Sequence, residues 1–182
     1  MNDPIISVIL PVFNNEYTIS YSLESIFSQT LNRFEIICID DASVDNTLNK
    51  INNFTSDKRL KLISNETNIG AANSRNKGIN ESIGRYIAFL DSDDIWFPNK
   101  LEKQINFMHA HNCPVVCSSY YRLLSTKKRQ KVVSPPNYIS YQDMLKSNFI
   151  GFPTSVIDTK QVGKRYFRPF RVKEDYIFWL DL

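Results

Sequence analysis

The first half of the chain alternates short apolar runs with amphipathic segments. Runs in which successive residues are apolar predict strands buried on both faces, over residues 5–10, 34–39, 60–64 and 85–90. Apolar residues at spacings of three and four predict helices over residues 17–29, 45–54 and 70–82. This alternation is typical of a mainly parallel central sheet with helices on both faces, so we expect an α/β fold.

The second half of the chain is patterned less regularly. A helix is predicted from Pro98, a residue suited to the first helical position, with Leu101, Ile105 and Met108 on one face. The weaker patterns that follow predict a strand over 114–121, a short helix over 141–145 and a strand over 154–157. The chain stops within a helical pattern that has no capping glycine, so we expect the native polypeptide to continue beyond Leu182.

Composition places the chain among soluble globular domains. It has 182 residues, of which 42% are hydrophobic and 23% charged, enough for one domain with a buried core. A net charge of +3 is too small to indicate nucleic-acid binding, and we expect none. The three cysteines form no CxxC pair and indicate reduced thiols in a cytoplasmic protein. Signal-peptide and membrane-spanning patterns are absent, so we expect no membrane crossing.

Two stretches carry positive charge without any acidic residue. Residues 122–131 include five cations, and residues 160–173 include six. Both stretches are consistent with solvated loops. They are also consistent with contact to an anionic membrane surface or to a phosphorylated, lipid-linked acceptor, so peripheral contact with the inner face of the membrane stays open.

Candidate ligand-binding residues, many of them acidic, lie at the ends of three of the predicted strands. They are Pro11, Val12, Phe13 and Asn14; then Asp40 and Asp41; then Asp91, Ser92, Asp93 and Asp94. Open α/β sheets bind ligands at the carboxyl ends of their strands, so these groups are expected to meet on one rim. The glycine-rich phosphate-binding loops GxGxxG and GxxxxGKS do not occur. Carboxylates that hold Mn²⁺ or Mg²⁺ are the natural substitute for binding a diphosphate.

Each acidic group also has a purely structural interpretation. Asp91 and Asp93 stand two residues apart, so one can hold a metal while the other accepts from a sugar hydroxyl, yet both also suit a solvated turn. Asp41 suits a turn that leads into a helix as well as ligand binding. Glu174 and Asp175 suit the first turn of a helix through the helix dipole. Near apolar aromatic residues, Asp175 would also serve as a general base.

Four segments, taken in their order, resemble the family 2 glycosyltransferases of the GT-A fold. They are ISVILPVFNN, SQTLNRFEIICIDDASVDNT, NIGAANSRNKGINESIGRYIAFLDSDDIWFPNKLEKQ and KEDYIFW. The resemblance covers essentially the whole chain and is strongest over residues 5–105. It implies a single GT-A, Rossmann-like domain over residues 1–182. Within it, residues 1–97 would form the nucleotide-sugar-binding half and residues 98–182 the acceptor-side half.

The resemblance also implies an activity. Family members of this kind move a sugar from a nucleotide sugar, often UDP-linked, to an acceptor hydroxyl with inversion, using Mn²⁺ or Mg²⁺. The acceptors it implies are saccharides or lipid-linked saccharides in cell-surface polysaccharide or glycolipid synthesis. One alternative is a non-catalytic nucleotide-sugar binder. Another, a sugar-nucleotide pyrophosphorylase, is disfavoured because its Gly- and Arg-rich loop after the first strand is absent.

By position, the resemblance assigns roles to individual residues. The donor-binding residues it implies are Pro11, Val12 and Phe13 around the base and ribose, with Asn14 beside them, Asp41 at the uracil edge, and Asp91 near the ribose and sugar. Asp93 would ligate the metal. Asp175 would be the catalytic base, supported by Glu174. Arg75 faces the same region, where it would contact the diphosphate or form a salt bridge.

Overall fold

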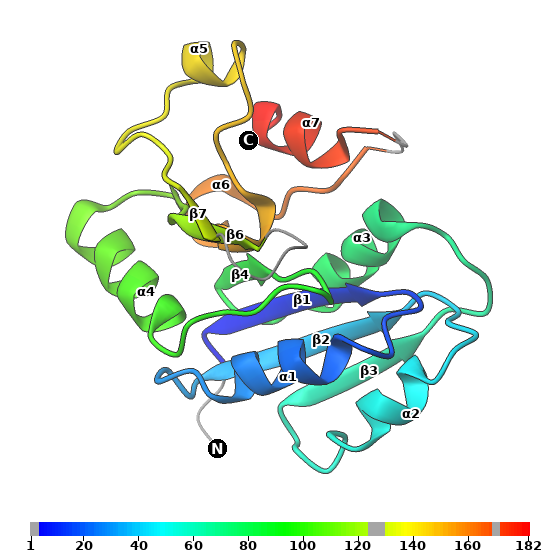
Figure 1. Ribbon diagram of the computed structural model, residues 1–182. Helices are drawn as coiled ribbons and strands as arrows, with labels where there is room; N and C mark the ends of the chain where they lie inside the picture. The colour runs from blue at the N-terminus through cyan, green and yellow to red at the C-terminus, as the bar shows by residue number, and fades with distance from the viewer. Residues whose placement is uncertain (1–3, 124–129, 169–171) are drawn as a thin grey trace.

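The protein is organised around one six-stranded sheet in the order β3-β2-β1-β4-β8-β5 (Figure 1). The computed structural model describes residues 4–123, 130–168 and 172–182. The strands are β1 (Ile6–Val12), β2 (Phe34–Asp40), β3 (Leu60–Ser64), β4 (Tyr86–Phe89), β5 (Val115–Val116) and β8 (Val156–Asp158). Strands β1 to β4 are parallel to one another, while β8 runs antiparallel to β4 and β5. The predicted α/β fold with a mainly parallel sheet is confirmed.

Helices cover both faces of this sheet, as the alternation of the sequence predicts. The main helices are α1 (Ile19–Phe27), α2 (Thr47–Asn52), α3 (Ala71–Glu81), α4 (Lys100–His111) and α7 (Glu174–Leu180). Ile6, Val8 and Leu10 of β1 pack with α1, α2 and α4, whereas Ile9 points to the opposite face with α3 and α7. Successive side chains of a strand point to opposite faces, so the continuous apolar run of β1 fills both cores.

The structure corrects the strand predicted over residues 114–121. That segment forms two strands, β5 and β6 (Tyr120–Leu123), and β6 pairs with β7 (Gln130–Val133) in a separate two-stranded sheet. The pattern did not reveal β7 because its four residues, QKVV, are two polar residues followed by two apolar ones and show no alternation. Of the two basic stretches, residues 124–129 and 169–171 lie outside the described residues.

A cluster of aromatic rings holds α7 against the sheet. Phe178 of α7 stacks on Phe167 at 4.4 Å between ring centroids and meets Phe89 of β4 edge-on at 5.8 Å. Phe152 lies 4.6 Å from the Phe89 ring. Burial of such rings dominates core energetics, and their edge-to-face geometry adds specificity. The first turn of α7, with Glu174, is thereby fixed relative to the end of β4.

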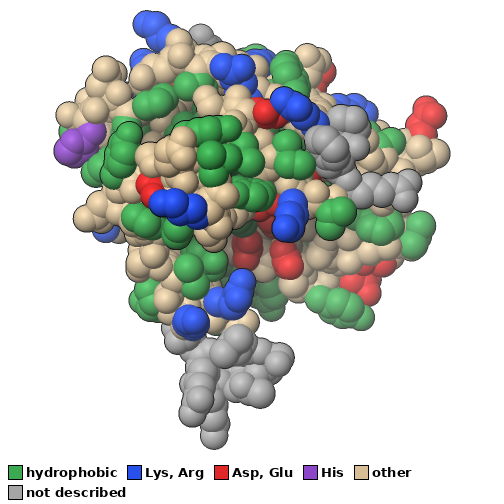
Figure 2. Space-filling model, turned by 90° about the horizontal axis from the view of Figure 1, so that it is seen from above, with side chains coloured by type: hydrophobic (Ala, Val, Ile, Leu, Met, Phe, Trp, Pro, Cys, Tyr) green, Lys and Arg blue, Asp and Glu red, His purple; other side chains and the backbone are tan. Residues whose placement is uncertain are grey.

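The remaining elements are short. These elements are α5 (Tyr141–Met144), a 3₁₀ turn (Phe152–Thr154) and α6 (Thr159–Val162). Viewed from above, acidic, basic and hydrophobic side chains are interspersed, and no single sign of charge dominates that face (Figure 2). Across the described parts of the chain, no helix combines the length and apolar character needed to cross a bilayer.

Candidate active site

The end of β1 forms the first part of the predicted rim. Pro11 and Val12 are buried, whereas the side chain of Phe13 is 44% exposed. Asn14 adopts a positive φ of 51°, and its side-chain oxygen accepts the backbone N–H of Val44 at 2.9 Å. Asn14 therefore ties the loop after β1 to the loop after β2. Of the four residues predicted here, Phe13 offers the large exposed surface on which a flat ring could pack.

Asp41, which follows β2, is buried and holds a loop of its own chain. One carboxylate oxygen accepts from Asn65 Nδ2 at 2.8 Å and from the backbone N–H of Ile69 at 2.9 Å. The other accepts from the backbone N–H of Gly70 at 2.8 Å, where a φ of 86° suits glycine. A carboxylate has about four acceptor positions, so one remains for a further N–H group. The predicted contact to a uracil edge stays a prediction.

Hydrogen bonds join the acidic turn after β4 to α1 and to the loop after β1. Ser22 Oγ donates to the backbone carbonyls of Ser92 at 2.9 Å and Asp94 at 2.8 Å. Ser92 Oγ donates to Asn15 Oδ1 at 2.7 Å. Ser22 and Asn15 were not among the residues predicted for the site. A serine among the apolar residues of the inward face of α1 was the available signal, because a buried hydroxyl needs a partner.

Arg75 joins this turn to the start of α7. Its guanidinium lies 2.7 Å from the Asp91 carboxylate and 3.6 Å from that of Glu174, and its side chain is 9% exposed. It also packs over the ring of Phe152 at 4.6 Å. Arg75 is thus salt-bridged, the second of its two predicted roles. Its Nε and Nη1 atoms make no hydrogen bond with a described residue, so contact with a ligand phosphate stays a prediction.

The acidic turn carries more negative charge than Arg75 offsets. Asp93 is exposed and accepts no hydrogen bond from a described residue. Burial, together with the negative charges of Asp91 and Asp93, raises the pKa of Asp94 to about 6. Within the described residues, no group of three or more acidic, histidine or cysteine side chains could hold a metal ion. Mg²⁺ and Mn²⁺ commonly bind through one or two carboxylates plus substrate phosphates, an arrangement that Asp93 fits.

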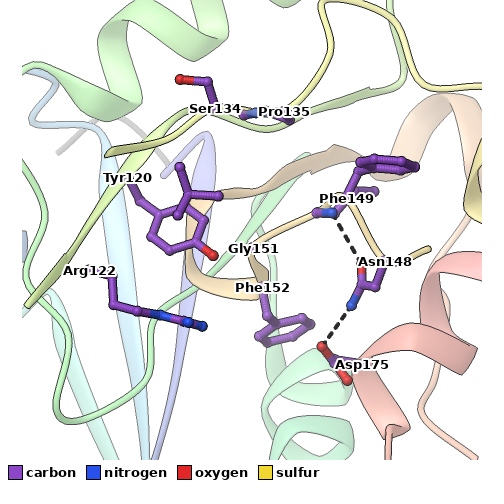
Figure 3. Close-up of a pocket in the computed structure, with 11 residues that line it drawn as sticks. Tyr120, Arg122, Ser134, Pro135, Asn148, Phe149, Gly151, Phe152 and Asp175 are labelled. Carbon is purple, nitrogen blue, oxygen red and sulfur yellow. Dashed lines mark hydrogen bonds between the residues drawn. The ribbon is translucent and has the colours of Figure 1, made fainter. Parts of the chain in front are cut away.

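Asp175 lies in the first turn of α7 at the edge of a cavity of about 330 Å³. Its carboxylate accepts a hydrogen bond from Asn148 Nδ2 at 3.1 Å. Figure 3 shows Asn148 and Asp175 joined at this cavity, with Arg122 extending toward them from β6. The residues that line it include Tyr120, Arg122, Asn148, Phe149, Phe152 and Asp175. Asn148 was not predicted for the site, because its loop shows no pattern that marks a functional residue.

The fold and the rim define a class of protein. A mainly parallel sheet with an acidic turn after β4 and an aspartate at the start of α7 is the arrangement expected of a GT-A glycosyltransferase. Residues 7–161 match the family described as Glycosyl transferase family 2, and the chain belongs to this family. The predicted family is confirmed.

Relatives support the same assignment. Over 182 residues the chain is 42% identical to WfgD of Escherichia coli, described as UDP-Glc:alpha-D-GlcNAc-diphosphoundecaprenol beta-1,3-glucosyltransferase, with 100% of this chain and 71% of WfgD covered. It is 35% identical to TuaG of Bacillus subtilis, described as a putative teichuronic acid biosynthesis glycosyltransferase, with 98% of this chain and 72% of TuaG covered.

A solved structure agrees with the fold. The S. aureus TarS 1-349 structure in complex with UDP matches with a TM-score of 0.76 and 26% identity. The match covers 95% of this chain and 53% of that chain, so the present chain spans about half the length of the solved structure.

Proposed function

We propose that this chain transfers a sugar from a UDP-sugar to a hydroxyl group of a lipid-linked saccharide, with inversion at the anomeric carbon. The observation that carries the proposal is the bridge from Asp91 through Arg75 to Glu174. This bridge joins the strand end expected to bind the donor to the helix that carries Asp175. The side chain of Asp175 lines a cavity. The proposed donor site and the proposed proton acceptor would then lie next to each other, joined by a buried arginine and two partly buried carboxylates.

The donor end of the site suits a uridine nucleotide. Support comes from TarS, whose structures include complexes with UDP and with UDP-GlcNAc. Phe13 would pack against the base, Asp41 would accept a base N–H group, and Asp91 would meet the ribose or the sugar. Asp93 and the donor phosphates would hold Mn²⁺ or Mg²⁺. When bound, the cation neutralises the negative charge that grows on the leaving diphosphate.

The acceptor end of the site suits removal of a proton. Asp175 takes the proton from the acceptor hydroxyl, and Asn148 holds the carboxylate in one orientation through their hydrogen bond. The hydroxyl oxygen forms its bond to the anomeric carbon as the bond to the diphosphate oxygen breaks on the opposite face. A single displacement of this kind inverts the anomeric centre, as it does in inverting glycosidases.

The names of the relatives support a proposal for the acceptor class of this chain and for its location in the cell. The name of WfgD gives a sugar linked through diphosphate to undecaprenol as its acceptor, and the name of TuaG gives teichuronic acid biosynthesis. We infer that this chain takes an acceptor of similar chemistry. It would then act in the cytoplasm, at the inner surface of the membrane in which such a lipid is embedded.

Transfer to a synthetic acceptor tests this function. The chain is incubated with Mn²⁺, a panel of UDP-sugars and N-acetylglucosaminyl diphosphate with an octyl tail, and UDP release and product are measured. We expect transfer from one donor, with the opposite anomeric configuration in the product by NMR. Asp175→Asn should bind UDP normally and transfer nothing. UDP binding by the unaltered chain without transfer or donor hydrolysis would favour the alternative, a non-catalytic nucleotide-sugar binder.

A further inference from the structure

One face of the β6–β7 hairpin forms a wall of the cavity beside Asp175. Tyr120, Arg122 and Val133 line the cavity, and β6 and β7 pair in an antiparallel register. Because successive residues point to opposite faces of a strand, Tyr121 lies on the other side, away from the cavity. In Figure 3 the side chain of Arg122 extends from β6 toward Phe152 and Asp175. A guanidinium and the expected catalytic carboxylate therefore face the same space.

The charges of this cavity are not paired with each other. Among the described residues that line it, Arg122 and Asp175 are the charged ones. Asp175 accepts its hydrogen bond from Asn148, and the neighbouring Glu174 pairs with Arg75. Arg122 makes neither an ion pair nor a hydrogen bond with any described residue. Its donors are therefore available to a ligand that enters the cavity.

A free guanidinium beside a carboxylate selects a particular kind of ligand. The planar guanidinium carries five N–H donors in a fork that matches the oxygens of a phosphate. A wholly neutral sugar would leave this charge without an anionic partner. A ligand carboxylate would also pair with the guanidinium, but a phosphate group offers it more acceptor oxygens. The rings of Tyr120 and Phe149, which also line the cavity, offer apolar surface to a sugar ring.

Resting on the proposed function, we propose that Arg122 binds the phosphate attached to the accepting sugar, while Asp175 receives the proton from a hydroxyl of that sugar. The acceptor is therefore a saccharide that carries a phosphate or diphosphate ester. A volume of about 330 Å³ is near the lower end for ligand pockets, so a sugar with its phosphate fits and a long lipid tail stays outside.

Calorimetric binding in the presence of UDP and Mn²⁺ tests the proposal independently of transfer. The probes are N-acetylglucosaminyl diphosphate with an octyl tail, octyl N-acetylglucosaminide without phosphate, and N-acetylglucosamine 1-phosphate without a tail. The variants are Arg122→Met, Arg122→Lys and, as a control, Lys103→Met. Lys103 is an exposed cation on α4 and does not line the cavity.

We expect Arg122→Met to bind both phosphate-containing probes about tenfold more weakly or worse, and the phosphate-free glycoside unchanged. Arg122→Lys should recover part of the affinity, and Lys103→Met should behave like the unaltered chain. An equal loss for all three probes, a loss confined to the tailed diphosphate, or an equal loss in Lys103→Met would overturn the proposal. If the phosphate preference is present and depends on Arg122 but no sugar is transferred, the proposed function fails and the phosphate site stands.

Discussion

The guanidinium of Arg75 lies 2.7 Å from the carboxylate of Asp91, and a further contact of 3.6 Å extends this ion pair to Glu174. The three side chains come from α3, from the turn after β4 and from α7. With Arg75 9% exposed and the two carboxylates about a third exposed or less, the pairing is largely screened from water. The ion pair therefore holds the acidic turn and the helix with Asp175 in one fixed relation.

Removal of Arg75 should destabilise the protein and inactivate it. Arg75→Ala leaves two partly buried carboxylates without their partner, and we expect a loss of about 2 kcal/mol in the free energy of unfolding. Urea denaturation followed by fluorescence measures it. Lys61→Ala is the control, since Lys61 pairs with Glu81 at 2.6 Å on the exposed surface and should cost less than about 1 kcal/mol. Equal losses in the two variants would contradict this account of the bridge.

The stability of the chain should rise with pH because of Lys100. Its Nζ lies 3.9 Å above the ring of Trp96 and has no hydrogen-bond partner among the described residues. Burial lowers the pKa of Lys100 from 10.5 to about 7, and it outweighs the attraction of the ring for the charge. Between these two values the unfolded chain binds more protons than the folded one, so the free energy of unfolding increases with pH.

Substitution of Lys100 isolates this contribution. Lys100→Met should be more stable than the unaltered chain by about 4 kcal/mol near pH 7, and the difference should shrink steadily as the pH rises toward 10.5. Urea denaturation at a series of pH values measures the difference. Lys103→Met on the exposed face of α4 serves as the control and should show no such trend. A stability difference for Lys100→Met that stays constant with pH would show that folding does not lower the pKa of Lys100.

The hydrogen bond from Asn148 should control the acid limb of the pH–rate profile. Asn148→Asp places a second carboxylate about 3.1 Å from Asp175, and like charges that close disfavour ionisation of both. We expect the acid limb of kcat to move to higher pH by about one unit. Asn148→Ala removes the hydrogen bond to the carboxylate without adding a charge, so it should lower kcat and move the limb to higher pH by less than Asn148→Asp does. A profile that is unchanged in Asn148→Asp would mean that Asp175 is not the base.

A close approach at Gly84 should make that position intolerant of any side chain. A Cβ atom there would lie 2.7 Å from the backbone carbon of Ile6 and from the backbone nitrogen of Ser7, neither of which can turn away. Gly84→Ala should therefore cost about 1–3 kcal/mol of stability, measured by thermal or urea unfolding. Ile83→Ala, at a neighbouring side chain that is 71% exposed, should change stability by less than about 0.5 kcal/mol.

The features that the sequence could predict are those that repeat or lie at strand ends. The apolar runs of β1 and β2 and the helical spacing in α1 are local signals, so the parallel half of the sheet followed from them. Parallel strands end at the same edge of a sheet. Asp41 and Asp91 could therefore be predicted to lie on one rim from their positions after strands alone. The acidic pair at the start of α7 was likewise visible as a helix beginning.

What the sequence could not show depends on contacts between distant segments. Nothing in the spacing of Arg75 and Glu174 indicates that the two meet, because the aromatic core around Phe152 and Phe178 brings them together. The same holds for Asn148, whose loop has no periodicity. The β6–β7 hairpin could not be predicted, because strands this short contain too few residues to show a regular pattern of polar and apolar positions.

The central claim is that Asp93 and the donor phosphates share a divalent cation while Asp175 acts only on the acceptor. Calorimetric titration with UDP, with and without Mn²⁺, tests it in Asp93→Asn, Asp175→Asn and the unaltered chain. We expect Mn²⁺ to strengthen UDP binding in the unaltered chain and in Asp175→Asn, and to have little effect in Asp93→Asn. An equal effect of Mn²⁺ on UDP affinity in all three proteins would contradict the account.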